Sequence, residues 1–497
     1  MCTALGNVTI KNIVFDESFK TYAPTSLKGF FENCKTLEKI SGLEYLNTAN
    51  VTDMNSMFYG CSALTSLDLT KFNTANVTTM RYMFKECSAL NSLNLTKFNT
   101  ARVTDMNCMF YGCYALKSLD LTNFNTENVT DMNCMFFYCN ALKSLDLTKF
   151  NTANVTDMES MFQLCKALES LDLTNFNTAN VTGMRLMFYG CSALTTIYAS
   201  DNFKTEKVGI SDNMFWECNN LKGFIEYNKN NTDLQYANYK TGYFTKLVGK
   251  NGEEKIGAAG ETLTAESLAL DDNKDFVAYE PFAAKSASYS RTMNAGTTWA
   301  TLCLPFKVSL DGKNFRAFKL LSADEGTETV ELEEVKTIEA GTPVIIKMND
   351  GETQLNFTVA NKAIANEVKT AATADGNYQL QGLYTQKEFS KDADNNCYIV
   401  KGNKLMNPAM LLEKTKVQKV ASKPFRAYMV DNSSAPVDGV KMFSIAIGGG
   451  TTAIDSLNTI ADDKAEYYDL QGKRLNEPQK GINIVKRNGK TMKVIIK

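Results

Sequence analysis

The sequence predicts an α/β solenoid of short parallel strands and short helices, followed by a β-rich, sandwich-like domain and a small β tail. Three observations support this prediction. A 26-residue unit recurs through the first half of the chain, strand-like runs separated by turns fill most of the second half, and a glycine-rich break precedes the last segment. With 497 residues, the chain is long enough for about three such domains.

The repeat is visible in the segment LTSLDLTKFNTANVTTMRYMFKECSAL, which recurs at a constant step. Cysteine follows the same step and marks eight turns at Cys34, Cys61, Cys87, Cys113, Cys139, Cys165, Cys191 and Cys218. A single unit cannot bury its own apolar side, whereas stacked copies can. We therefore expect an N-terminal cap at residues 1–33 and a solenoid over residues 34–245.

Each unit is expected to contain a strand and a helix. Leu67 and Leu69 alternate with Asp68, which is the period of a short strand with one buried face. Apolar residues at helical spacing follow at Val77, Met80, Met83, Phe84 and Cys87. They predict a short helix or 3₁₀ segment packed on the strand, with Thr78 as its N-cap. The L-x-x-L-x-L core followed by Phe-Asn is the spacing of leucine-rich repeats.

The unit LxxLDLTxFNTxxVTxMxxMFxxCxxL resembles that of BspA-like leucine-rich-repeat surface proteins, whose repeat is shared with mycoplasma-type lipoproteins. The resemblance covers about residues 8–225. It implies a secreted or surface-anchored bacterial protein that adheres to host matrix proteins or to other cells.

One candidate binding surface is a row of polar residues at equivalent positions of successive strands. Equivalent side chains stack one strand apart, so they form a ladder that points away from the core. Its members are Asp68, Asn94, Asp120, Asp146 and Asp172, each flanked by serine and threonine two residues away. Carboxylates in a row attract cations or basic partners. The alternative is a solvated face that only keeps the sheet soluble.

A second candidate surface is aromatic. Tyr59, Tyr111, Phe137 and Tyr189 occupy one slot of the unit, directly after the Met-Phe pair. Exposed aromatic side chains are favoured anchors for protein or sugar ligands. They would equally serve to cover the ends of the predicted helices.

The regular cysteines fit no zinc motif, and we interpret them as buried free thiols that pack as small apolar residues. Cys108 and Cys134 differ, because they occupy a slot where other units carry serine, tyrosine or leucine. Whether these two pair as a disulfide stays open.

The second half reads as a connecting segment at 246–290 and a β-rich domain at 291–447. Its strand-like strings TWATLCLPF, EAGTPVIIK and FRAYMV resemble those in C-terminal regions of surface proteins from gut and oral bacteria. The loops starting at Asp271 and Asp392 have alternating oxygen ligands like the beginning of a calcium loop, but lack its glycine and glutamate. We interpret both loops as solvated turns.

A glycine-rich linker at 448–453 leads to a C-terminal β tail at 454–497, with a hairpin turn expected at Asn488-Gly489. The strings YDLQG and GINIV of this tail resemble the C-terminal sorting domains of the type IX secretion family. Both resemblances imply export, yet the N-terminal sequence lacks the charged segment and apolar run of a signal peptide. We therefore expect a truncated or misassigned start of the chain.

The composition excludes several kinds of chemistry. The chain has no histidine, which removes Ser-His-Asp and Cys-His nucleophile pairs and HExxH metal sites. Lysine plus arginine total 53 against 55 aspartate plus glutamate, so no basic field favours nucleic acid. No window reaches the roughly 18 apolar residues of a membrane helix. We expect no catalytic residues, metal, cofactor or transmembrane segment.

These observations favour a non-enzymatic surface or secreted protein that binds a macromolecular partner, a host or bacterial surface protein or a glycan, along its repeat array. Near-identical units repeat one weak contact, and multivalency then supplies avidity. One alternative is a structural spacer that holds the tail domains off the cell surface. Another is a carbohydrate-active enzyme that uses two carboxylates in the β-rich half.

Overall fold

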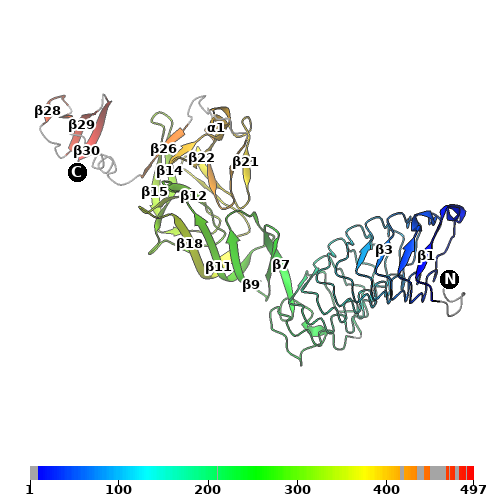
Figure 1. Cartoon of the computed structure of the whole chain (residues 1–497). Coiled ribbons are helices and arrows are strands. Elements are labelled where there is room, and N and C mark those ends of the chain that lie inside the picture. Colours follow the sequence, from blue (N-terminus) through cyan, green and yellow to red (C-terminus); the bar gives the residue numbers. More distant parts are fainter. Residues whose placement is uncertain are drawn as a thin grey trace. The chain divides into compact units, whose positions relative to one another are not determined.

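The computed structural model describes residues 9–209, 211–414, 419–433, 442–447, 466–469, 471–475, 481–487 and 490–496. The chain divides into two compact units. The first comprises Met1–Ala269, Val277–Ala287 and Ala360–Ile364, and the second comprises Leu270–Phe276, Ser288–Val359 and Ala365–Lys497. The repeats belong to the first unit, where their coils stack side by side (Figure 1).

Short parallel strands form one side of the stack. They are β1 (Asn12–Val14), β2 (Lys39–Ser41), β3 (Ser66–Asp68), β4 (Ser92–Asn94), β5 (Ser170–Leu173) and β6 (Thr196–Ala199). Pairing is in register with the repeat, so Leu67 lies opposite Leu93 and Leu171 opposite Ile197. Three short 3₁₀ helices lie near the ends of the stack: η2 (Glu17–Thr21), η3 (Leu43–Tyr45) and η4 (Leu234–Tyr236).

The other side of each coil is not helical, and the predicted α/β solenoid with short helices is therefore wrong. Where a helix was expected, hydrogen bonds run alternately to the next coil and back within the same coil. Phe58 N–H donates to the Met83 carbonyl of the next coil at 2.9 Å, whereas Cys61 N–H donates to the Phe58 carbonyl at 3.1 Å. Isolated parallel bridges, such as that between Asp53 and Thr79, add to these backbone hydrogen bonds between coils.

The backbone conformation explains why no helix forms. Ser56 and Gly60 have φ angles of 55° and 72°, and each following unit repeats a left-handed residue at the first of these slots. A left-handed residue every few positions interrupts the run of right-handed φ and ψ angles that an α-helix requires. Thr78 caps no helix, because its hydroxyl donates to the Thr52 carbonyl of the preceding coil at 3.1 Å.

The core of the stack contains a column of phenylalanine rings, one from each coil. Its members are Phe31, Phe58, Phe84, Phe110, Phe136, Phe162, Phe188 and Phe215, all fully buried. Successive rings are stacked with centroids 5.1–5.8 Å apart and with interplanar angles of 2–13°. Each repeat unit thus advances the stack by about one ring-to-ring distance.

Strand β7 (Phe244–Asn251) closes the stack by pairing in parallel with β6, and β8 (Glu254–Ala258) pairs with β7 to form a hairpin. With β5 and the short β10 (Phe276–Ala278), they make a five-stranded sheet in the order β10-β7-β6-β5, with β8 on β7. Another sheet has the order β18-β11-β9, from β9 (Thr264–Asp271), β11 (Phe282–Thr292) and β18 (Gln354–Ile364).

The second unit is built around one ten-stranded sheet in the order β12-β17-β14-β15-β26-β23-β22-β25-β20-β19. Its strands are β12 (Trp299–Leu302), β14 (Phe315–Asp324), β15 (Thr329–Val335), β17 (Val344–Met348), β19 (Thr370–Ala372), β20 (Tyr378–Gly382), β22 (Cys397–Lys401), β23 (Lys404–Met406), β25 (Ala427–Asp431) and β26 (Met442–Ile447). Smaller elements are β13 (Val308–Ser309) with β16 (Thr337–Ile338), β21 (Lys387–Phe389) with β24 (Val420–Ser422), and α1 (Pro408–Lys414), the single α-helix among the described residues.

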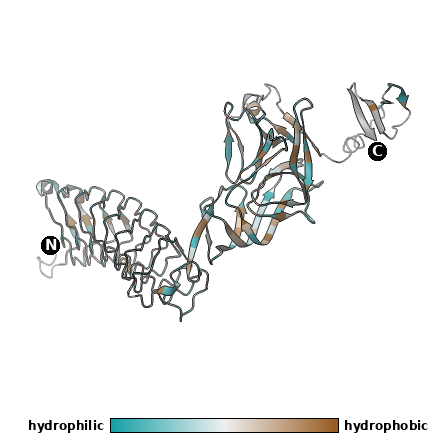
Figure 2. Ribbon diagram, turned by 180° about the vertical axis from the view of Figure 1, so that it is seen from behind, coloured by the Kyte–Doolittle hydropathy of each residue, from teal (hydrophilic) through white to brown (hydrophobic). Residues whose placement is uncertain are grey.

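The predicted sandwich of two sheets is wrong as well. Strands from opposite halves of the ten-stranded sheet touch, β12 with β25 and β14 with β20, so the sheet curls into a half-barrel. One core lies inside it, with Phe318, Ile345 and Phe443 fully buried. Buried and partly exposed residues alternate along β20 and β25, as expected for strands with one packed face. Figure 2 shows the corresponding mixture of hydrophobic and hydrophilic residues within single strands.

The C-terminal segment contains a four-stranded antiparallel sheet in the order β28-β27-β29-β30. Its strands are β27 (Glu466–Tyr468), β28 (Arg474–Leu475), β29 (Gly481–Arg487) and β30 (Lys490–Ile496). The expected linker at 448–453 and the expected turn at Asn488-Gly489 lie outside the described residues. None of the described helices has the length and apolar composition that crossing a bilayer requires.

The phenylalanine column predicts an unequal response of two neighbouring residues. Replacing Phe136 by Ala removes a fully buried ring stacked on both sides and should lower the free energy of unfolding by about 3–5 kcal/mol. Phe137→Ala is the matched control, because this half-buried ring stacks only on Tyr111 among the neighbouring coils and should cost about 1 kcal/mol. Urea unfolding followed by circular dichroism measures both. Equal losses would contradict the column as the source of stability.

Candidate binding surface of the repeat stack

The predicted polar ladder lies on the exposed strand side of the stack, and each member begins the same turn. Asp68, Asn94 and Asp172 belong to β3, β4 and β5, whereas Asp120 and Asp146 lie in coils that form no strand at this position. In every coil the Oδ1 atom of the ladder residue accepts hydrogen bonds from the backbone N–H and the hydroxyl of the threonine two residues later. For Asp120 these distances to Thr122 are 3.0 and 2.6 Å. Asn94 makes the same two bonds to Thr96, at 3.1 and 2.7 Å. An amide therefore replaces the carboxylate at this slot without changing the turn.

The turn also fixes the charge of the ladder. Hydrogen bonds from threonine lower the pKa values of Asp68, Asp120 and Asp146, so these carboxylates are ionised at neutral pH. Their Oδ2 atoms accept no hydrogen bond from any residue that the structure describes. An open groove of about 500 Å³ runs across three coils of this face. Its polar lining is Ser66, Asp68, Thr70, Ser92, Asn94, Thr96, Ser118 and Asp120.

Asp172, the last member of the ladder, is not available in the same way. It is partly buried and pairs with Lys255 from β8. Burial would raise its pKa, but the hydrogen bonds from Lys255 and Thr174 hold the pKa below its usual value. The open part of the ladder therefore comprises the coils before this one.

The four predicted aromatic residues lie in one row, and all are half-buried. Tyr111 and Phe137 stack with their ring centroids 4.5 Å apart. Lys85 occupies the same slot in the coil between Tyr59 and Tyr111, with its ammonium 5.4 and 4.7 Å from their ring centroids. Tyr189 is separated from Phe137 by the coil that carries Gln163. The row is thus an aromatic surface with one cation inserted, and alignment of the units would have placed Lys85 in it.

A second row of carboxylates was not predicted. Asp105, Asp131 and Asp157 form the isolated parallel bridges between coils. They lie on the side of the stack where the helices were expected, which we call the turn side. Asn133 Nδ2 donates to Asp157 Oδ2 at 3.3 Å, and Asn107 Nδ2 bonds Asp131 in the same way. Burial raises the pKa values of Asp105 and Asp157. The sequence shows the 26-residue step of these aspartates, but it does not show that their side chains are partly buried.

From Cys61 onward, the regular cysteines each donate a hydrogen bond to a carbonyl of the preceding coil. Cys139 Sγ lies 3.3 Å from the Phe110 carbonyl oxygen and Cys165 Sγ lies 3.1 Å from that of Phe136. Burial raises the pKa of Cys113 to about 12. The thiols from Cys61 to Cys218 in this row are free and buried, whereas Cys34, its first member, is disulfide-bonded.

Cys108 and Cys134 are free thiols on adjacent coils. Both have left-handed backbones, with φ angles of 53° and 54°. The bond between the two thiols raises the pKa of Cys108 and lowers that of Cys134, which a bond from Ser160 lowers further. Cys134 is therefore the thiol of this pair that ionises first.

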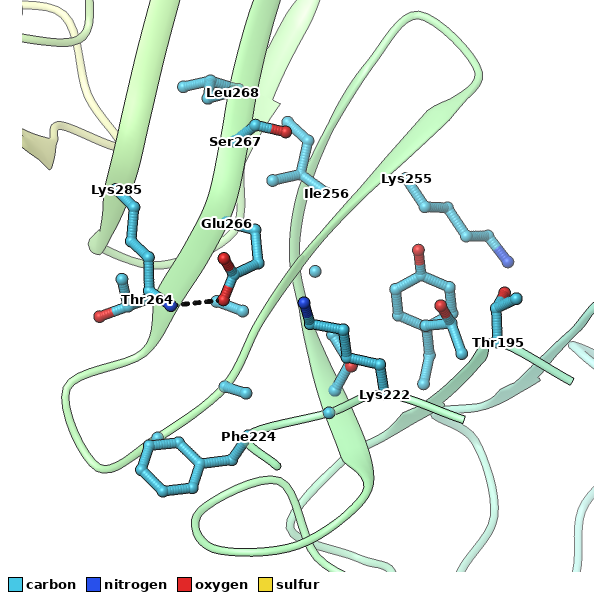
Figure 3. Close-up of a pocket in the computed structure, with 18 of the residues that line it drawn as sticks. Thr195, Lys222, Phe224, Lys255, Ile256, Thr264, Glu266, Ser267, Leu268 and Lys285 are labelled. Atoms are coloured by element: carbon cyan, nitrogen blue, oxygen red, sulfur yellow. Dashed lines mark hydrogen bonds and ion pairs between the residues drawn. The ribbon is translucent and has the colours of Figure 1, made fainter. Parts of the chain in front are cut away.

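A cleft of about 890 Å³ adjoins the C-terminal end of the stack within the first unit (Figure 3). The last coils contribute Thr195, Lys222 and Phe224, and the strands β8, β9 and β11 contribute residues that include Lys255 and Glu266. Sequence reasoning missed this cleft, because its residues are not repeated. Gly257 is required in its wall, since a Cβ atom there would lie 2.3 Å from Thr245 Cγ2 and 3.0 Å from the Tyr198 ring.

The lysines of the cleft are all paired with carboxylates. Lys285 lies 2.6 Å from Glu266 and Lys222 lies 3.2 Å from Glu226. The ring of Phe224 is 56% exposed at the rim. Balanced charges with an exposed ring suit a neutral polar partner, such as a sugar ring or a peptide segment, better than a strongly charged one.

The two calcium-like loops are occupied by bonds within the protein. Asp271 Oδ1 accepts the Asn273 N–H at 2.9 Å, and Asp275 Oδ1 accepts the Gln386 N–H at 2.7 Å. In the second loop, Asp394 pairs with Lys387 at 2.9 Å. These carboxylates act as turn and ion-pair acceptors.

Comparison with known protein families gives a match for two overlapping segments of the repeat stack. Residues 25–120 and 115–228 match a family described as Mycoplasma protein of unknown function, DUF285. No curated protein and no solved structure matches the chain significantly. The match supports the mycoplasma part of the predicted resemblance for the repeats, whereas the BspA-like and sorting-domain resemblances stay predictions.

The thiol environments predict a single fast-reacting cysteine in the stack. At pH 8 and without reductant, Cys134 should react first with a disulfide reagent, because it is partly exposed and its pKa is lowered. A pKa of about 12 should slow a row thiol such as Cys113 by about a thousandfold relative to an ordinary thiol. Cys134→Ser should abolish the fast phase. A fast phase that appears only after reduction and is absent from the Cys134→Ser variant would instead indicate a Cys108–Cys134 disulfide, because the disulfide of Cys34 is also reduced under these conditions.

The unpredicted carboxylate row should affect stability in a pH-dependent way. Because the folded-state pKa of Asp157 is raised, its charged form weakens folding above that pKa, and the effect disappears as pH falls below about 3.8. Asp157→Asn should therefore raise the unfolding midpoint at pH 7 by about 1–3 °C, a small value because the side chain is partly exposed. The gain should vanish at pH 3.5. Calorimetry at both pH values checks this, and an equal shift at both would contradict it.

Proposed function

We propose that the chain, whose repeats match a mycoplasma protein family, is a non-enzymatic bacterial surface or secreted protein that binds a macromolecular partner along its repeat stack. The observation that carries the proposal is the polar ladder. Asp68, Asn94 and Asp120 present the same side-chain geometry to one open groove at the step of the coils. A partner with its own repeated groups gains avidity from each further coil that it contacts.

The surface chemistry favours a protein or glycan partner with basic or hydrogen-bonding groups. Ionised carboxylates and hydroxyls line the groove. The aromatic row and the cleft at the end of the stack add rings at which sugar or peptide groups pack, among them Tyr111 and Phe224.

Substitution of the ladder tests the proposal. The triple variant Asp68→Asn, Asp120→Asn, Asp146→Asn should keep the fold, because Asn94 already makes the same turn. Binding to a lysine-rich peptide and to any matrix protein or glycan captured in a screen should weaken by about 3- to 100-fold at low salt. Surface plasmon resonance measures the affinities.

The matched control is Asp53→Asn, Asp105→Asn, Asp157→Asn, which makes the same change of charge on the turn side of the stack. Equal weakening by both variants would show a general charge effect and would count against the ladder.

A deletion variant that lacks one coil, residues 115–140, tests whether the stack binds a partner or acts only as a spacer. Graded loss of binding supports the array, and unchanged binding supports the spacer.

A further inference from the structure

Three segments that are far apart in the sequence meet at one polar pocket of the second unit. They are the loop that contains Asp272, the string TWATLCLPF with Thr301, and the string FRAYMV with Arg426. The pocket has a volume of about 430 Å³, within the range of small-molecule sites. Its lining is mainly polar and also includes Arg291 and Trp299.

One wall of the pocket is a buried ion pair. Arg426 donates to Asp272 through both terminal nitrogens, with Nη1–Oδ1 and Nη2–Oδ2 distances of 2.6 and 2.8 Å. The Tyr289 hydroxyl also donates to Asp272, and Arg426 Nη1 donates to the Tyr289 oxygen at 3.0 Å and to the Pro424 carbonyl at 3.0 Å. The single carboxylate of the lining is thereby committed to Arg426.

Arg291 lies beside this pair without a carboxylate of its own. Its Nη1 donates to the Thr301 carbonyl oxygen at 3.1 Å, and it forms no ion pair with any residue that the structure describes. Burial, and then the charge of Arg426, lower the pKa of Arg291 to about 10. A desolvated guanidinium next to a second one is stabilised when an anion supplies the missing charge.

Two lysines add to the excess of positive charge. Lys423 Nζ bonds to the neutral Asn273 Oδ1 at 2.7 Å, and Lys401 lines the pocket from the end of β22. Neither forms an ion pair with a described residue. The lining thus has four cations, Arg291, Lys401, Lys423 and Arg426, but only the carboxylate of Asp272.

The backbone beside the pocket is strained. Phe425, which precedes Arg426, has a φ angle of 59° although it is a bulky, fully buried residue. Left-handed conformations at such residues are rare and are held only where the surroundings enforce them, often at ligand sites. Here the conformation places Phe425 against Tyr289, with ring centroids 5.4 Å apart, and brings Arg426 to Asp272.

We propose that this pocket binds a small oxyanion, a phosphate, sulfate or carboxylate group, with Arg291 as its principal ligand and Lys401 and Lys423 as supporting cations. The planar fork of Arg291 matches two oxygens of such a group. The volume admits a free oxyanion or a monosaccharide that carries one. This proposal is independent of the function proposed for the repeat stack.

Calorimetric titration of the full chain tests the proposal with phosphate, sulfate, citrate and glucose 6-phosphate as probes. Sodium chloride at matched ionic strength and unphosphorylated glucose are the reference ligands. We expect saturable one-site binding of the oxyanions and a raised unfolding midpoint. Tighter binding of glucose 6-phosphate than of phosphate assigns the pocket to an esterified anion, and the reverse assigns it to the free ion.

Arg291→Gln should weaken binding by about tenfold or more, because it removes a charged two-pronged donor. The control Arg316→Gln removes an arginine that pairs with Glu334 on the exposed surface, and it should leave binding unchanged. If Arg291→Gln fails to fold, the double variant Lys401→Gln, Lys423→Gln removes two pocket cations and should weaken binding by about 3- to 10-fold. No binding beyond that of chloride, or equal affinity in the Arg291 or lysine variants and the wild type, would overturn the proposal.

Discussion

The stack depends on one constraint, the register between successive coils that places each buried phenylalanine ring against the next. Each coil adds one phenylalanine to the column, and neighbouring centroids lie 5.1–5.8 Å apart. The thiol of the next unit's cysteine donates to the carbonyl of a phenylalanine in the preceding unit, as Cys165 does to Phe136. Both contacts persist where the step is 27 residues, as between the rings of Phe188 and Phe215 and between Cys218 Sγ and the Phe188 carbonyl, so a coil accommodates one extra residue without losing this register.

The same constraint aligns every other row of equivalent side chains in the stack. Once the rings are in register, the ladder aspartates, the aromatic slot and the buried threonines are in register too. Thr74, for example, donates to the Asn99 carbonyl of the next coil at 2.9 Å and accepts from its N–H at 2.8 Å. These bonds satisfy polar backbone groups that would otherwise be buried without partners. The rows on the surface are therefore a consequence of core packing, and selection can change their chemistry one coil at a time.

The two proposed sites differ in the way that their residues are provided. The ladder is made by repetition, so it is shallow, extended and suited to a partner that contacts several coils. The pocket of the second unit is formed where Asp272, Arg291 and Arg426 converge, and none of these residues belongs to a repeat. Such an asymmetric, charged pocket suits one small ligand. Histidine contributes to neither, so neither surface has a group that titrates near pH 6.5 without a shifted pKa.

The sequence by itself determined the repeat length, the buried face and the polar ladder, because these follow from the spacing of residues such as Leu67, Asp68 and Phe84. It could not determine the conformation between them. Met80 and Met83 have helical spacing, but the left-handed residues at Tyr82 and Glu86 turn the backbone toward the next coil. That choice depends on hydrogen bonds between coils, which no single unit contains.

Tertiary structure alone decided the rest. The curl of the ten-stranded sheet depends on which strands pair, and a linear pattern of strands does not specify this. The cleft around Phe224 and the pocket around Arg291 join residues far apart in sequence, and their chemistry depends on which charges are compensated. An ion pair such as Arg426–Asp272 is recognised only when two distant side chains meet in space. Local spacing therefore predicts the period and the faces of this protein, whereas charge balance and pocket formation are properties of the folded chain.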